Sequence, residues 1–194
     1  MARGQTVLIL GATGVVGQVA TQVARQPGAK RIIAAGRKLE AVAVKEVDAI
    51  FALGQPEEIA REAFAEEASE GIDVVIDYLW GRPTELLLEA LARGFRPSTA
   101  RSTRLLEVGE SAGKTINLPG ATLRSIDLKL MGSGFGSVPL ERVLNALLTL
   151  FSLAAAARLR VAVGPVPLAE VEGTWNRVDK GRRIVFTVPS PGTA

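Results

Sequence analysis

Apolar residues along the chain follow two alternating patterns up to about residue 157. Short continuous apolar runs predict buried strands at residues 6–10, 31–35, 49–51, 72–77, 105–108 and 127–131. Apolar positions at helical spacing predict helices at residues 14–25, 38–44, 56–69, 83–93 and 139–157. Residues 95–104 and 111–125 are expected to be loops. Strands that are apolar throughout and alternate with helices are typical of a parallel sheet covered on both faces.

This alternation predicts an α/β fold, a Rossmann doubly wound sheet of six parallel strands in the order 3-2-1-4-5-6. After about residue 160 the pattern changes. There we expect short strands at residues 161–163 and 183–188, a stiff link at 164–167 and a helix at 169–179. The chain therefore divides into a main domain, residues 1–159, and a C-terminal strand-helix-strand arm, residues 160–194.

Three glycines at spacing three lie where the first strand gives way to the first helix. Such a turn suits a diphosphate bound by the amides of a helix N-terminus. A glycine triplet also serves ordinary turns, but the strand before it and the helix after it favour a dinucleotide site. The predicted cofactor-binding residues of this turn are Gly11, Ala12, Thr13, Gly14, Val15, Val16 and Gly17.

The end of the second strand indicates which dinucleotide binds. A site for NAD places an acid about 20 residues past the glycines, where it holds the ribose 2′-hydroxyl. Here the sequence has Gly36, Arg37 and Lys38 instead. Basic side chains at this point would pair with a 2′-phosphate, so we predict NADP(H) as the cofactor. The alternative is that both charges are simply solvated at the start of a helix.

Two further strand ends would meet the rest of a bound dinucleotide, because the carboxyl ends of parallel strands share one edge of the sheet. The fourth strand ends in Asp77, Tyr78, Leu79 and Trp80, and the fifth in Val108, Gly109, Glu110 and Ser111. Tyr78 and Trp80 would serve equally well as a core aromatic pair.

Composition narrows the chemistry. The 194 residues contain no Cys and no His, which excludes thiolate or imidazole catalysis and nearly every zinc site. We therefore expect no metal. The net charge is +3, the basic residues are scattered and aromatic residues make up 5%, so nucleic-acid binding is not expected. The most apolar stretch, residues 143–157, is shorter than the roughly 20 residues of a membrane helix. Without a signal-peptide pattern, we expect a soluble cytoplasmic protein.

No residue presents itself as a proton donor. Short-chain dehydrogenases open with a similar glycine turn, but they also need a Tyr with a Lys four residues later on a helix. The only tyrosine is Tyr78, and Arg82 stands four residues on, beside Pro83. The catalytic residues are therefore unknown from the sequence.

An ordered set of short motifs resembles one family. They lie at residues 11–17, 34–37, 76–81, 108–113, 118–125, 130–134, 166–172 and 181–186. Together they resemble the medium-chain dehydrogenase/reductase superfamily, in its zinc-free quinone-oxidoreductase-like branch. The resemblance covers nearly the whole chain and corresponds to the cofactor-binding domain.

The resemblance implies hydride transfer from NADPH to a quinone, an enone or another small carbonyl compound. It also implies a homodimer, which we expect to form through the edge strand near residues 127–131. Members of the family begin with a catalytic domain, which we expect to be absent here, and the arm resembles the segment that returns to it. The alternative function is a non-catalytic NADP(H)-binding sensor or regulatory module.

Overall fold

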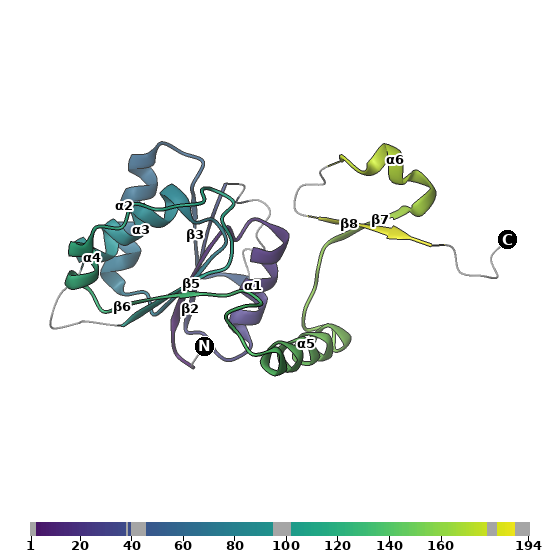
Figure 1. Cartoon of the computed structure of the whole chain (residues 1–194), viewed down its shortest axis with the longest axis horizontal. Coiled ribbons are helices and arrows are strands. Elements are labelled where there is room, and N and C mark those ends of the chain that lie inside the picture. The colour runs from purple at the N-terminus through teal and green to yellow at the C-terminus, as the bar shows by residue number, and fades with distance from the viewer. Residues whose placement is uncertain (1–2, 38, 40–45, 95–101, 178–181, 189–194) are drawn as a thin grey trace.

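The computed structural model of the chain describes residues 3–37, 39, 46–94, 102–177 and 182–188, and its main domain is built around one parallel sheet (Figure 1). The strands of that sheet are β1 (Thr6–Leu10), β2 (Arg31–Gly36), β3 (Ala49–Ala52), β4 (Val74–Asp77), β5 (Thr103–Glu107) and β6 (Leu128–Gly132). Their order is β3-β2-β1-β4-β5-β6, and all five pairings are parallel. The predicted fold is confirmed.

The main domain contains five α-helices among the described residues, and three of them pack on the faces of the sheet. The five are α1 (Val15–Arg25), α2 (Glu57–Glu70), α3 (Gly81–Gly94), α4 (Gly120–Ser125) and α5 (Leu140–Ala155). Figure 1 shows α2 and α3 on one face and α1 on the other. The side chains of β1 alternate accordingly: Leu8 and Leu10 pack with the first group, whereas Val7 and Ile9 pack on the α1 side.

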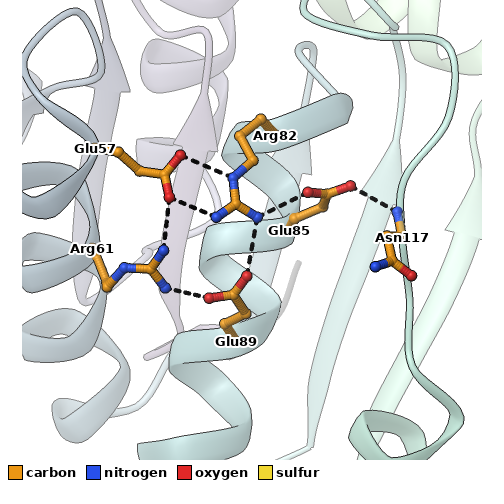
Figure 2. A network of polar contacts seen from close by, with 6 residues as sticks. All are labelled: Glu57, Arg61, Arg82, Glu85, Glu89 and Asn117. Atoms are coloured by element: carbon orange, nitrogen blue, oxygen red, sulfur yellow. Dashed lines mark hydrogen bonds and ion pairs between the residues drawn. The ribbon is translucent and has the colours of Figure 1, made fainter.

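A network of ion pairs ties α2 to α3 on the outer surface (Figure 2). Arg82 donates to Glu57 at 2.6 and 3.0 Å, to Glu85 at 2.9 Å and to Glu89 at 3.0 Å. Arg61 joins Glu57 at 2.7 Å and also bonds Glu89. Ion pairs therefore join α2 to α3 at the surface, and apolar side chains of both helices pack together beneath them.

The arm forms a separate two-stranded sheet (Figure 1). Its strands β7 (Val163–Pro167) and β8 (Arg183–Thr187) are parallel, and between them lie a 3₁₀ turn (Leu168–Glu170) and the short helix α6 (Val171–Thr174). The link into the arm is fastened to α1. Arg160 donates its N–H to the side chain of Gln22 at 2.8 Å, and the Gln22 amide donates back to the Arg160 carbonyl at 2.9 Å.

Several element boundaries differ from the sequence-based prediction. The segment 111–125 was predicted as loop, but its end forms α4. Residues 164–167 were predicted as a link, but they belong to β7. Of the helix predicted at 169–179, the described residues up to 177 contain the end of the 3₁₀ turn and the short helix α6. β5 begins at Thr103, inside the predicted loop 95–104. The helix predicted at 38–44 lies almost wholly outside the described residues.

Much of the apolar surface of β6 and α5 is uncovered. Leu144, Leu148 and Phe151 on α5 are 51%, 65% and 68% exposed, and Met131 on β6 is 42% exposed. None of the helices in the described part of the chain has the length and apolar character that crossing a membrane requires.

Candidate functional site

The sheet has a single point where the chain order reverses, between β1 and β4. In open α/β sheets, ligands bind at such a point, outside the carboxyl ends of the strands. The turns after β1, β2, β4 and β5 all lie at that edge, because the four strands are parallel neighbours. The predicted site residues stand in these turns.

The glycine turn connects β1 to α1 with little space to spare. Gly11 has φ +87°, a left-handed conformation that favours glycine. Its N–H and that of Ala12 donate to the Ala35 carbonyl at 2.8 and 3.0 Å. A Cβ on Gly17 would lie 2.3 Å from the Gly11 carbonyl oxygen, so only glycine lets α1 pack this closely on the turn. Ala12 is fully buried and belongs to the core.

The N-terminus of α1 offers amide groups to an anion. Its N-cap is Gly14, no side chain caps it, and the first turn carries no acid. The first N–H groups of a helix have no partner within the helix, and the helix dipole is positive there. Gly14 and Val16 are exposed, while Thr13 and Val15 are half-buried beside them. A Cβ on Gly14 would lie 3.5 Å from the Gly11 carbonyl oxygen, which is an ordinary contact distance.

The turn after β2 adjoins the glycine turn. A Cβ on Gly36 would lie 2.4 Å from the methyl group of Thr13, so the two turns are in direct contact. Arg37 follows with an exposed side chain. Lys38 lies outside the described residues. The role of Arg37 toward a ligand at the glycine turn stays a prediction.

The turn after β4 is held by a buried carboxylate. Asp77 is fully buried; one of its oxygens accepts the N–H groups of Leu79 and Trp80 at 2.8 and 2.9 Å, and the other accepts the Thr84 hydroxyl. Burial raises the pKa of Asp77, and these three hydrogen bonds oppose that rise. Whether Asp77 also meets a cofactor stays a prediction, since its oxygens already have partners.

The aromatic residues of this turn are partly buried on opposite sides of the sheet. Tyr78 packs against the α1 side, and Leu79 and Trp80 pack against the side of α2 and α3. Burial raises the pKa of Tyr78. A tyrosine that donates a proton at neutral pH needs the opposite shift. Tyr78 is therefore poorly suited to act as an acid.

The turn after β5 folds onto the turn after β4. Val108 and Gly109 donate their N–H groups to the Asp77 carbonyl at 2.8 and 3.2 Å, and the Ser111 hydroxyl donates to the Tyr78 carbonyl at 2.9 Å. Glu110 and Ser111 are exposed at the rim. The structure thus brings the two predicted groups together.

Sequence reasoning missed three contributors to this edge. Thr84 holds Asp77, and Ala112 and Gly113 lie against Gly81. An acid at the end of an apolar strand was a signal that a polar partner must be buried nearby, but its position could not be read from spacing. Within the described residues, no group of three or more His, Cys, Asp or Glu could hold a metal ion.

Relatives of this chain are found both among curated proteins and among solved structures. No protein-family profile matches the chain. A probable NADPH-dependent quinone reductase, TdiC from Emericella nidulans, is 27% identical over 191 residues, which cover 94% of this chain and 54% of that protein. The crystal structure of a putative alcohol dehydrogenase from Sinorhizobium meliloti is 29% identical with a TM-score of 0.69, and the match covers 97% of this chain and 50% of that one. The resemblance to the medium-chain dehydrogenase/reductase superfamily is confirmed.

The match is to the cofactor-binding portion of that superfamily. The crystal structure of CurA from Vibrio vulnificus in complex with NADPH has the same fold, with a TM-score of 0.70 at 17% identity over 98% of this chain and 59% of that one. The chain spans about half the length of TdiC and of the two structures. The relatives described here are named as oxidoreductases, a quinone reductase and a putative alcohol dehydrogenase.

Proposed function

We propose that the chain is the NADP(H)-binding part of a zinc-independent oxidoreductase that passes hydride to a quinone, an enone or another small carbonyl compound. The observation that carries the proposal is the glycine turn at the reversal point of the sheet, with the uncapped N-terminus of α1 behind it. Two relatives support it: TdiC is described as a probable NADPH-dependent quinone reductase, and CurA was crystallised in complex with NADPH.

The residues present fit a dinucleotide with a 2′-phosphate. The amides at the start of α1 suit the diphosphate, and the N-cap residue Gly14 is exposed. Arg37 is exposed directly after β2, and Arg37 and Lys38 stand where an acid would hold a free 2′-hydroxyl. The turns after β4 and β5 would line the remainder of the ligand.

The residues present indicate which part of the reaction the cofactor would supply and which part the protein would. The bound dinucleotide supplies the hydride, and the protein binds it, orients it and keeps water away. The chain has no His or Cys, and its one tyrosine has a pKa shifted away from neutrality. We therefore infer that a proton would come from the substrate's surroundings on another part of the protein.

The arm fits a two-domain arrangement. We propose that residues 1–159 form the dinucleotide domain and that residues 160–194 lead to a second domain that would close the substrate cleft. The separate β7–β8 sheet and the matched share of the relatives, about half, support this division. Pockets of this kind lie between domains, so this part alone would hold substrate weakly.

A homodimer is the assembly that we propose. β6 stands at one end of the sheet, and in the described residues it pairs with β5 alone. Apolar side chains of α5, the next helix along the chain, are also exposed. A second copy related by a twofold axis would cover both elements and continue the sheet.

A non-catalytic NADP(H) sensor is the second candidate. The lack of an identified proton donor favours it, and the similarity to oxidoreductases disfavours it. Turnover of a quinone or enone with NADPH by the full-length protein would decide for the enzyme.

A titration with NADPH and NADH, followed by tryptophan fluorescence, tests the proposal. We expect NADPH to bind about tenfold more tightly, a difference of about 1.4 kcal/mol. Arg37→Ala should remove this preference, whereas Arg93→Ala, in the last turn of α3, should keep it. Equal binding of the two ligands by the unchanged chain would contradict the NADP(H) assignment, and no binding of either would contradict the dinucleotide site.

A further inference from the structure

The turn after β4 has an unusual backbone. Trp80 and Gly81 both adopt left-handed conformations, with φ +53° and +63°. For a tryptophan this conformation is unfavourable, and it persists only where the surroundings impose it. The buried Asp77 carboxylate supplies that constraint, because one of its oxygens accepts the N–H groups of both Leu79 and Trp80.

The same turn contacts both neighbouring turns of the site. On one side, a Cβ on Gly11 would lie 3.1 Å from the Leu79 side chain, so that side chain packs directly on the glycine turn. On the other side, Ala112 donates its N–H to the Leu79 carbonyl at 2.7 Å. A Cβ on Gly81 would lie 2.8 Å from the Ala112 carbonyl oxygen, which leaves no room between the two turns.

Thr84 completes the arrangement from α3. Its side chain is fully buried, and its hydroxyl donates to the second oxygen of Asp77. The carboxylate therefore has a partner on each oxygen and is fixed in one orientation. The first turn of α3 and the end of β4 are joined through these two side chains.

We propose that Asp77 and Thr84 are positioning residues for the cofactor site. They hold residues 78–81 as a spacer between the glycine turn and the turn after β5, and so set the width of the subsite for the nicotinamide half. This inference rests on the proposed function and deepens it. The adenosine half would lie toward β2, so its binding would not depend on this spacer.

A pair of matched variants separates this role from ordinary stability. Thr84→Val removes the hydroxyl that fixes Asp77. Thr103→Val is the control: Thr103 is also buried, and its hydroxyl donates to the Ile72 carbonyl at 2.7 Å, before β4 begins. Both changes remove one buried hydrogen bond, so both should lower the Tm.

Of the two variants, only Thr84→Val should weaken the binding of NADPH. We expect its Kd for NADPH to rise roughly tenfold, while the Kd for 2′,5′-ADP, which lacks the nicotinamide half, stays unchanged. Thr84→Ser, which restores a hydroxyl, should recover the affinity. Faster amide hydrogen exchange at Ser111 and Ala112 in Thr84→Val, and not in Thr103→Val, is the second expected readout.

The outcomes are distinguishable. If Thr84→Val and Thr103→Val change the NADPH affinity equally or leave it unchanged, the positioning role is wrong and the dinucleotide site stands. If Thr84→Val weakens NADPH and 2′,5′-ADP alike, the spacer does not act on the nicotinamide half. If the unchanged chain binds neither ligand, the proposed function fails and this inference fails with it.

Discussion

At the scale of single residues, Gly17 is the position where packing leaves the least freedom. A Cβ there would lie 2.3 Å from the Gly11 carbonyl oxygen and 2.6 Å from the Ala12 Cα, and both are backbone atoms that cannot rotate away. Gly17→Ala should therefore push α1 off the turn and cost about 1–3 kcal/mol of stability. The measurement is the Tm together with the Kd for NADPH.

Gly173→Ala is the matched control for this change. Gly173 is also helical, in α6, and a Cβ there would meet nothing within 4 Å. Its Tm should stay unchanged or rise slightly, since alanine favours a helix more than glycine does. Equal effects of the two variants would show that the close approach at Gly17 is not limiting.

The pKa of Asp77 predicts how its contribution to stability varies with pH. Burial raises this pKa in the folded state, so the unfolded chain loses its proton at lower pH than the folded chain. The stabilising contribution is then complete below about pH 4, and it is lost as the pH rises through the folded pKa. Asp77→Asn cannot titrate, so we expect its Tm relative to the unchanged chain to rise between pH 3 and pH 7. A constant difference between the two Tm values would contradict the raised pKa.

At the scale of elements, the ion-pair network determines how α2 and α3 respond to acid. The bonds from Arg82 and Arg61 lower the pKa of Glu57 from 4.5 to about 2. A lowered pKa means that the contribution is present above the unfolded value and is lost as the pH falls toward about 2. Glu57→Gln should therefore reduce the Tm at pH 7 and reduce it less at pH 2.5.

Glu58→Gln is the control for this prediction. Glu58 is the next residue of α2 and is exposed, and the network does not include it. The effect of Glu57→Gln should also shrink in molar salt, because exposed charge pairs are screened. If Glu58→Gln follows the same pH course, the network is not its cause.

The sequence predicted most elements of the main domain because their signals are local. Strands such as β1 and β2 are continuous apolar runs, and Pro56 and Pro139 mark helix starts at α2 and α5. One error of the sequence-based prediction concerns a strand that depends on a partner far along the chain. β7 contains two prolines and forms only by pairing with β8, which follows some twenty residues later along the chain. The short helix α4 carries no buried residue, so it has no apolar face to reveal it.

In the candidate site, too, local features were predictable from the sequence and contacts between distant segments were not. The glycine turn was predictable because strand, glycine spacing and helix adjoin in sequence. The contacts of Asp77 with Thr84, and of Gly81 with Ala112, were not predictable, because the first joins a strand to a helix and the second joins the start of α3 to a loop. Such contacts depend on how the chain packs rather than on residue spacing.

At the scale of the whole molecule, exposed apolar side chains stand on β6 and on α5, the helix that follows it in the chain. Leu144, Leu148 and Phe151 lie on α5 at helical spacing, and each is more than half exposed. Apolar patches on this scale mark interaction surfaces. Together with the unpaired edge of β6 in the described residues, they favour a second copy as the occupant, since one twofold contact would cover both features.

Leu144→Glu tests the proposed dimer. A charge at this position would be buried without a partner in the dimer, but it would be solvated in the monomer, so the change should shift the equilibrium toward monomers. Ile59→Glu is the control, because Ile59 on α2 is 49% exposed and Leu144 is 51% exposed, yet α2 lies outside the proposed interface. Sedimentation equilibrium at tens of micromolar should then show dimers for the unchanged chain and for Ile59→Glu, and monomers for Leu144→Glu with an unchanged NADPH affinity. A monomeric unchanged chain would contradict the dimer and leave the dinucleotide site in place, because that site lies at the other side of β5, around β1 and β4.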